Sequence, residues 1–467
     1  MKLHRWEIVI LVLILLCGAG LRLYYLGSAP LWVDESISAV ASSAILDRGV
    51  PLLDSGVWYG RAYFFHYEQA FVLGLWHSDA ALRLISVLFG LLTIVLGYFI
   101  GREYSKFGGV LTALFLAFFY LEVFYSRQGR FYQLFQLAFF LSLYLLYKSR
   151  EKTWLLWPAL GAFVIAFDTH LAGVVLAPFF AIHIFSHEKR SRWWKALFTL
   201  LPFLYYRTSS VSAVSKSIDS TLNYAGLISP YTRNIQYLLI FFIPGMIWAF
   251  MKRKYLTFLM IAPSLILLIG LFFVKTFAFR YAYFFAFPLA LYASLLIAFL
   301  YERYGKIMLV PLAIILILQS NIFFPLTYVT LIKPSAATHN DASAPIIDYK
   351  NIPHSLSQEL QRPETQLMTL FSPPVTWYIK KPQYVFPFSL DGRGTDQVSY
   401  NATDGSVVDI YSGALIRTTR PKGEFYFLAD SFSLSKLKPE QKERFEVIVA
   451  DCSIVYGGRD VMVYRCV

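Results

Sequence analysis

The sequence predicts a polytopic α-helical membrane protein with about eleven transmembrane helices, followed by an extracytoplasmic domain that is α/β or mostly β. Three observations support this fold class. The 467 residues are 57% hydrophobic and 18% aromatic, which is more apolar than a soluble globular protein of this length. Apolar stretches long enough to cross a bilayer core of about 30 Å recur along residues 1–326. Residues 327–467 are polar, with short strand-like runs such as SVVDIY and EFYFLA, and are predicted to form a separate water-facing domain.

The expected transmembrane helices follow the hydropathy of the chain. They lie near residues 8–24, 81–100, 108–125, 131–147, 154–170, 172–186, 196–206, 234–250, 256–274, 281–300 and 307–326. The helix at 196–206 is short and is interrupted by Pro202. A cleaved signal peptide is the alternative for the first run, but Arg22 and two tyrosines follow it where small residues would mark a cleavage site.

The net charge of +13 indicates orientation in a membrane and not a nucleic-acid partner. From Thr327 onward basic and acidic residues are equal in number, so the basic excess lies in the membrane part. It gathers in alternate loops, MKLHRW, GREYSK, KSREK, SHEKRSRWWK, MKRK and YERYGK. The positive-inside rule makes these loops cytoplasmic. We therefore expect a plasma or inner membrane protein with a cytoplasmic N-terminus and an extracytoplasmic C-terminal domain.

The loop at 25–80 carries the leading candidates for chemistry, Asp34 and Glu35 in the segment WVDES. Acids beside a membrane span are costly, so they point to a functional site. The alternative is that Asp34 is the N-cap residue of a helix. The following residues predict a short amphipathic helix that ends at Gly49 and rests on the membrane surface. Its apolar face would hold Ile37, Val40, Ala44 and Ile45.

Four more polar residues fall on the outer side, and they are candidates for binding a divalent metal ion or sugar hydroxyls. They are His66 and Glu68 in FFHYEQ, and Asp168 and His170 in AFDTHLAG. The alternative for the first pair is an interfacial aromatic belt with incidental polar residues. For the second pair, a histidine in such a place is more often structural.

Two basic clusters also fall on the outer side, against the usual inside bias. They comprise Arg127, Arg130 and Tyr132, and then Lys275, Arg280 and Tyr281. Guanidinium groups bind oxyanions in a fork, so both clusters are suited to a lipid phosphate or diphosphate. The alternative is that the arginines extend to lipid headgroups.

The three cysteines are too few for a disulfide scaffold. Cys17 lies within the first apolar run and is expected to be a packing residue. Cys452 and Cys466 flank YGGRD, a predicted hairpin turn, and could form a disulfide across two strands if this domain lies outside the cytoplasm.

Together these segments resemble the GT-C membrane glycosyltransferases, specifically the protein O-mannosyltransferase and aminoarabinose-transferase-like group. The resemblance rests on WVDES, ALRLISVLFGLLTIVLGYFIGREY, YSRQGRFYQLFQLAFFLSLYLL, DTHLAG and FRYAYFFAFPLALY, in this order, and covers roughly residues 1–326. It implies a polyprenyl-phosphate-linked sugar donor, with transfer outside the cytoplasm. Asp34 would be the general base, Glu35 its acidic neighbour, and Arg130 and Arg280 would hold the lipid phosphate. The chain departs from relatives with a proline-rich patch in the first loop, where it has FFHYEQ.

The function expected from the sequence is an inverting glycosyl transfer to an acceptor hydroxyl on a protein, lipid or glycan, with a divalent metal ion as a candidate cofactor. A transporter or lipid flippase is the main alternative. It is disfavoured because the charges at the membrane edge collect on one side and do not run through the bundle. A non-catalytic scaffold with a partner-binding outer domain is the third hypothesis.

Overall fold

The computed structural model describes residues 4–54, 56, 58–185, 225–271, 283–320, 346–386, 398–401, 407–409, 415–416, 421–437, 439–458 and 460–467. The chain forms two compact units. The helical unit comprises Met1–Tyr24, Arg61–Phe65 and Arg83–Tyr328, and the mixed unit comprises Tyr25–Gly60, His66–Leu82 and Val329–Val467. The mixed unit therefore joins most of the loop at 25–80 to the C-terminal segment.

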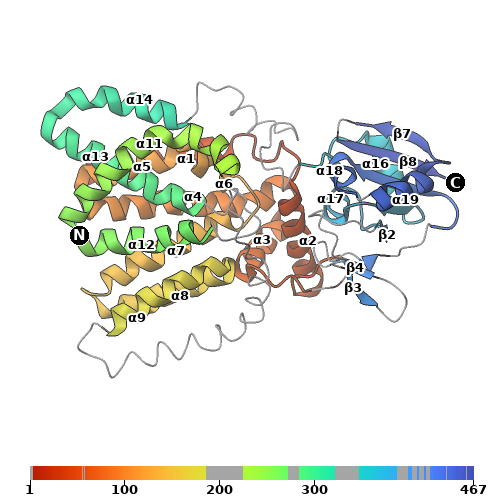
Figure 1. The fold of residues 1–467 in the computed structure, drawn as a ribbon, viewed down its shortest axis with the longest axis horizontal. Helices are drawn as coiled ribbons and strands as arrows, with labels where there is room; N and C mark the ends of the chain where they lie inside the picture. The colour runs from red at the N-terminus through yellow and green to blue at the C-terminus, as the bar shows by residue number, and fades with distance from the viewer. Residues whose placement is uncertain are drawn as a thin grey trace. The chain divides into compact units, whose positions relative to one another are not determined.

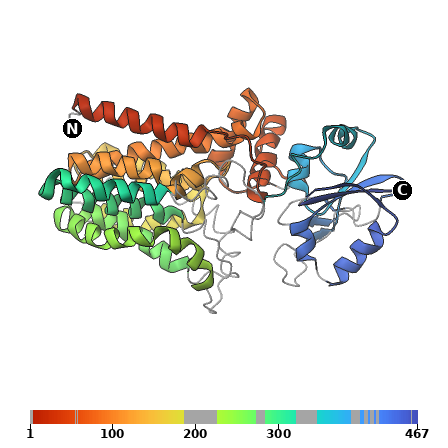
Figure 2. The same cartoon turned by 90° about the horizontal axis from the view of Figure 1, so that it is seen from above.

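The described part of the helical unit is almost entirely α-helical (Figure 1). Figure 2 shows the same helices from above. They are α1 (Arg5–Leu23), α4 (Asp79–Arg102), α5 (Lys106–Phe118), α6 (Tyr120–Ser126), α7 (Tyr132–Lys148), α8 (Leu156–Thr169), α9 (Ala177–Phe185), α11 (Ala225–Lys252), α12 (Lys254–Leu271), α13 (Ala286–Tyr304) and α14 (Leu309–Ser320). The first few residues of α4 belong to the mixed unit.

Three stretches of the described residues are long and apolar enough to cross a membrane, namely Arg5–Leu23, Asp79–Arg102 and Tyr283–Ile317. A fourth is the pair α5 and α6, which is bent by 59°. The helix expected at 108–125 coincides with this pair, and it is broken where the chain leaves helical geometry at Phe119. The helix expected at 196–206 lies outside the described residues, and the count of eleven stays a prediction.

A buried ion pair joins α1 to α4. Arg102 donates from Nε and Nη2 to the two carboxylate oxygens of Glu7, at 2.8 and 3.1 Å. The Tyr98 hydroxyl donates to the same carboxylate at 3.0 Å. Charged groups within an apolar bundle persist when they pair in this way, since an unpaired charge there is costly.

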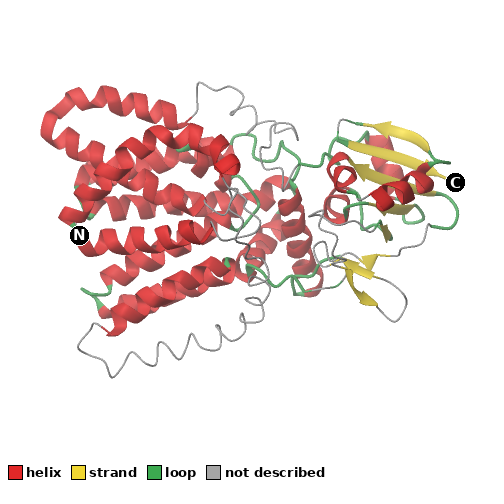
Figure 3. Cartoon of the chain, viewed as in Figure 1, coloured by secondary structure: helices red, strands yellow, loops and turns green. Residues whose placement is uncertain are grey.

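The mixed unit is built on a five-stranded sheet with the order β2-β1-β6-β8-β7, in which β2, β1 and β6 are parallel and β6, β8 and β7 are antiparallel (Figure 3). The strands are β1 (Gln366–Thr369), β2 (Tyr384–Val385), β6 (Phe425–Asp430), β7 (Ser453–Gly457) and β8 (Val461–Cys466). The helices that the C-terminal segment adds to the unit are α16 (His354–Gln361), α17 (Ser372–Tyr378), α18 (Ser431–Lys436) and α19 (Pro439–Val449). A second, antiparallel sheet contains β3 (Val398–Asn401), β4 (Val407–Asp409) and β5 (Leu415–Ile416). Of the two sequence-based alternatives for this domain, the α/β fold is the one found.

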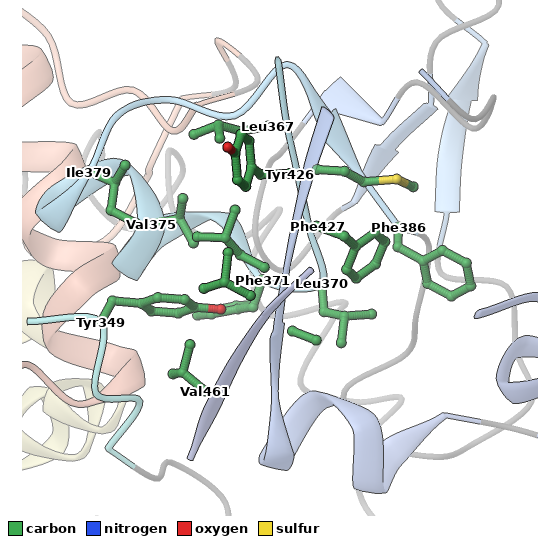
Figure 4. Packing of buried hydrophobic residues seen from close by; sticks show 14 of the residues in the cluster. Tyr349, Leu367, Leu370, Phe371, Val375, Ile379, Phe386, Tyr426, Phe427 and Val461 are labelled. Atoms are coloured by element: carbon green, nitrogen blue, oxygen red, sulfur yellow. The ribbon is translucent and has the colours of Figure 1, made fainter. Parts of the chain in front are cut away.

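The core of the mixed unit includes apolar side chains from both ends of the chain. Leu367, Phe371 and Phe427 are three of its almost fully buried members (Figure 4). Val33 and Ile37, from the loop at 25–80, are buried in the same cluster. The apolar area that stabilises the sheet is thus partly supplied by residues far away in the sequence.

Cys452 and Cys466 form a disulfide with their Cα atoms 4.2 Å apart. They lie at neighbouring positions of the β7–β8 ladder, where Ser453 pairs with Arg465. Cys17 is a free, exposed cysteine on α1.

Close approach of α11 and α13 depends on Gly245. A Cβ atom added at this position would lie 1.9 Å from the Tyr292 carbonyl oxygen, too close for any side chain. Small residues allow such backbone contact between membrane helices.

We therefore expect Gly245→Ala to separate the two helices and to lower the thermal unfolding temperature in detergent. The control is Gly270→Ala on α12, where an added Cβ meets nothing within 4 Å and no loss is expected.

Asp430 ends β6 and caps α18, because its Oδ1 accepts a hydrogen bond from Ser433 N at 2.7 Å. Burial raises the pKa of Asp430 from 3.8 to about 6. The folded domain therefore favours the protonated acid. The contribution of the Asp430 carboxyl group to the free energy of unfolding is full below about pH 4. This contribution falls by about 3 kcal/mol as the pH rises through 6.

We expect Asp430→Asn, which keeps a capping oxygen, to remove this loss. The measurement is the protection of the β6 and β8 amides against hydrogen exchange from pH 4 to 8, corrected for intrinsic rates. Wild type and variant should diverge as the pH rises, with the variant more stable at pH 7. Parallel pH profiles for the two proteins would contradict the assignment.

Candidate functional site

Helix α2 (Val33–Arg48) carries the two acids singled out in the sequence. Its N-cap residue is Trp32, so Asp34 lies inside the first turn and the N-cap interpretation of Asp34 is wrong. Glu35 is the acid that binds the N-terminal end of the helix, since its Oε2 accepts a hydrogen bond from Trp32 N at 3.3 Å. Both carboxylates also lie at the positive end of the helix dipole. The helix ends at Gly49 in a left-handed conformation (φ 76°), as predicted.

Protein covers part of the apolar face of α2 that was expected to lie on the membrane surface, since Ile37 and Val40 are buried. Val33 and Ile37 are buried in the core of the mixed unit, and α2 packs against α17. From Leu31 to Ser42 every residue is buried except Asp34, which is partly exposed. The fold therefore encloses this segment and leaves one acid, Asp34, partly exposed.

His66 contacts Ser38, which lies one helical turn after Asp34 on α2. Helix α3 (Tyr63–Leu75) buries the His66 ring, whose Nε2 is 3.2 Å from Ser38 Oγ. The ring also packs edge-on against Tyr59, at 5.2 Å between centroids. Ser38 follows Asp34 by four residues and so lies on the same face of α2. Glu68 follows His66 by two residues on α3, and residues two apart on a helix point in nearly opposite directions. Glu68 is therefore exposed where His66 is buried, and the structure does not bring the two side chains together.

Asp168 and His170 have structural partners at the end of α8. Asp168 Oδ2 accepts from Phe64 N at 3.2 Å, and its carbonyl oxygen accepts from Ala62 N at 3.1 Å. His170 Nδ1 accepts from Ala172 N at 3.1 Å and caps the following turn. Among the described residues, no three His, Cys, Asp or Glu side chains converge on a point that could hold a metal ion. The metal and sugar roles of His66, Glu68, Asp168 and His170 stay predictions.

The basic segment between α6 and α7 is buried. Arg127 Nη1 donates to the carbonyl oxygens that end α1, those of Leu21 (2.9 Å), Arg22 (3.1 Å) and Tyr24 (2.6 Å). Arg127 thus closes a helix C-terminus, a common place for a cation.

Two further members of this segment pack on aromatic rings. The Arg130 guanidinium lies 4.4 Å from the centre of the Phe131 ring. Tyr132 packs edge-on against Tyr125, at 5.9 Å between centroids. Lys275, Arg280 and Tyr281 lie outside the described residues.

The break at Phe119 has a matching cation that the sequence analysis did not single out for this role. Where α5 ends, the carbonyl oxygens of Leu116 and Ala117 lose their helical partners. Arg22, fully buried on α1, donates to them from Nη2 and Nη1 at 3.1 and 3.0 Å. The carbonyl oxygens that this sharp bend frees are thereby hydrogen-bonded within the protein itself.

Sequence reasoning also missed a buried network around Glu122. The Tyr283 hydroxyl lies 2.7 Å from Glu122 Oε2 and 2.5 Å from Gln133 Oε1. Gln136 Nε2 donates to Glu122 Oε1 at 2.8 Å. The signal was present, because an acid within an apolar stretch is by default a functional or structural site. The network joins α6 and α7, which flank the segment of Arg127 and Arg130, to the start of the Tyr283–Ile317 helix.

We expect Tyr283→Phe to lower the free energy of unfolding by roughly 1–2 kcal/mol, since it leaves buried acceptors without their donor. The measurement is thermal or denaturant unfolding of the purified protein in detergent. Tyr301→Phe is the matched control, because this tyrosine is only partly buried and stacks on Phe107. Equal stability of the two variants would contradict a role for the network.

Comparisons with known proteins agree with this architecture. Residues 60–208 match the family model of dolichyl-phosphate-mannose-protein mannosyltransferases. The structure resembles ArnT from Cupriavidus metallidurans bound to undecaprenyl phosphate, with a TM-score of 0.68 and 12% identity over 99% of this chain and 98% of that chain. It also resembles the oligosaccharyltransferase AglB from Archaeoglobus fulgidus in complex with an inhibitory peptide and a dolichol-phosphate, with a TM-score of 0.55 and 12% identity over 98% of this chain and 74% of that chain. Curated protein sequences give no significant match. The predicted resemblance is thus confirmed: the chain has the GT-C fold of these membrane glycosyltransferases, and residues 60–208 carry the mannosyltransferase family pattern.

Proposed function

We propose that this protein is an integral membrane glycosyltransferase that moves a sugar from a polyprenyl-phosphate-linked donor to an acceptor hydroxyl. The observation that carries the proposal is the exposure of Asp34 within an otherwise buried segment. The protein structures of the same fold were solved with undecaprenyl phosphate and with a dolichol-phosphate. We therefore assign a lipid phosphate of this class as the carrier of the sugar that this chain transfers.

In the proposed reaction Asp34 is the general base. Its carboxylate takes the proton of the acceptor hydroxyl as the acceptor oxygen bonds to the anomeric carbon of the sugar. The bond from that carbon to the phosphate oxygen breaks on the opposite face, and its electron pair leaves with the lipid phosphate. The configuration at the anomeric carbon is inverted.

Glu35 and the arginines have supporting roles in this proposal. Glu35 holds the first turn of α2 through Trp32 N and so fixes the backbone beside Asp34. Arg130 and Arg280 neutralise the phosphate as charge develops on it. Arg127 contributes mainly by ordering the end of α1, because its Nη1 is already shared among three carbonyl oxygens.

The proposed orientation follows the charge of the loops, with the N-terminus cytoplasmic and the mixed unit on the extracytoplasmic side. The disulfide between Cys452 and Cys466 is suited to an oxidising compartment. The acceptor is accordingly a protein, lipid or glycan hydroxyl outside the cytoplasm.

We expect Asp34→Asn to lower the rate of sugar transfer at least about a hundredfold, because the amide cannot take up the hydroxyl proton. The assay is transfer from a polyprenyl-phosphate-linked sugar by the protein in proteoliposomes, with and without a chelator. Asp47→Asn is the matched control, since Asp47 is an exposed acid near the other end of α2.

Wild-type transfer by Asp34→Asn would overturn the base assignment. Movement of the lipid across the membrane without any sugar transfer would favour the flippase alternative.

A further inference from the structure

The first residue of α4, Asp79, is held by three side chains from the C-terminal segment. Lys350 Nζ donates to Oδ2 at 2.7 Å, and Trp377 Nε1 donates to Oδ1 at 2.8 Å. The Tyr378 hydroxyl lies 3.1 Å from Oδ2. We call these four residues the Asp79 cluster. Asp79 is 7% exposed, so its contacts are largely shielded from water and from salt.

The same cluster reaches the backbone just before α2. Leu31 N donates to the Tyr378 hydroxyl oxygen at 2.7 Å, and Lys350 Nζ donates to the Gly27 carbonyl oxygen. Trp32 forms an antiparallel bridge with Ile346. Leu31 stands three residues before Asp34, so the hydroxyl of Tyr378 fixes the chain where it enters the helix that bears the proposed base.

A second anchor follows the other end of α2. Asp54 Oδ2 accepts from the hydroxyls of Ser372 and Thr376, at 2.9 and 2.8 Å. These two hydroxyls and the Tyr378 hydroxyl all belong to the single helix α17. Helix α2 itself packs against α17 between these two anchors.

We infer that Tyr378, with Lys350 and Trp377, is a positioning device that sets the place of Asp34, so that the C-terminal domain is part of the catalytic unit and not an accessory module. The catalytic part of this inference rests on the proposed function. Its structural part, the coupling of α17 to the start of α2, stands on the contacts alone. None of the three residues is assigned to the chemistry. They act through the backbone of residues 27–32.

The test uses the full-length protein in detergent or nanodiscs, with two variants that each remove one contact. Tyr378→Phe deletes the hydroxyl that joins Leu31 to Asp79, and Lys350→Met deletes the cation. We expect hydrogen exchange of the amides in residues 31–37 to become about tenfold faster in each, as for the loss of one partly buried hydrogen bond. The turnover number should fall about tenfold while the KM for the lipid donor stays within about twofold, because orientation of the base changes and donor binding does not.

Tyr384→Phe is the matched control, since this tyrosine lies on β2 of the same domain and is only partly buried. It should leave exchange and turnover unchanged. Protection of the β6 and β8 amides, measured in the same samples, shows whether each variant has kept its folded sheet. A merely unfolded domain would lose that protection as well.

Three results would overturn the whole inference or one of its two parts, the structural coupling and the catalytic positioning. Unchanged exchange of residues 31–37 in both variants overturns the coupling. Faster exchange with wild-type turnover overturns the positioning role. Faster exchange in a protein whose wild type transfers no sugar overturns the proposed function and the catalytic part with it, and supports the coupling.

Discussion

Polar groups that leave water in this bundle have to find their partners within the chain, and the helical unit is arranged around that requirement. The bend at Phe119 exposes carbonyl oxygens, and Arg22 binds them. The end of α1 is closed by Arg127. Glu122 is surrounded by hydrogen-bond donors from two other segments. The basic segment between α6 and α7 is fixed by these contacts. Its shape is therefore set by backbone satisfaction before any ligand is considered.

The sequence predicted what short-range patterns can carry. Hydropathy indicated a membrane protein, and the left-handed position at Gly49 ended α2 where expected. The partners of buried polar groups were not predictable in this way, because Tyr283 and Gln133 are 150 residues apart. Arg127 shows the same limit. An outer arginine is suited to a phosphate and to a helix end, and the sequence does not state which oxygens lie nearby.

Helix α2 illustrates a different limit. Its apolar positions were interpreted as a face for the membrane, and the structure buries Val33 and Ile37 against a protein core. Periodicity reveals that a face is apolar, but it does not reveal what covers that face. The covering residues come from the C-terminal segment, whose composition indicated only a separate water-facing domain. Asp34 was predicted as a site residue from its charge and its place in the chain, and its partial exposure within a buried segment could be seen only in the fold.

The shared core has a consequence for how the protein is made. Ribosomes lengthen a chain by about 5–20 residues per second, so α2 emerges on the order of tens of seconds before α17 and the strands that enclose it. During that interval the first loop has neither its apolar cover nor the hydrogen bond from Leu31 N to Tyr378. Residues 31–42 then remain without their final order until the C-terminal segment has been made and has folded over them. Under the proposed function, a nascent or truncated protein would accordingly transfer no sugar, and activity would begin with folding of the C-terminal segment.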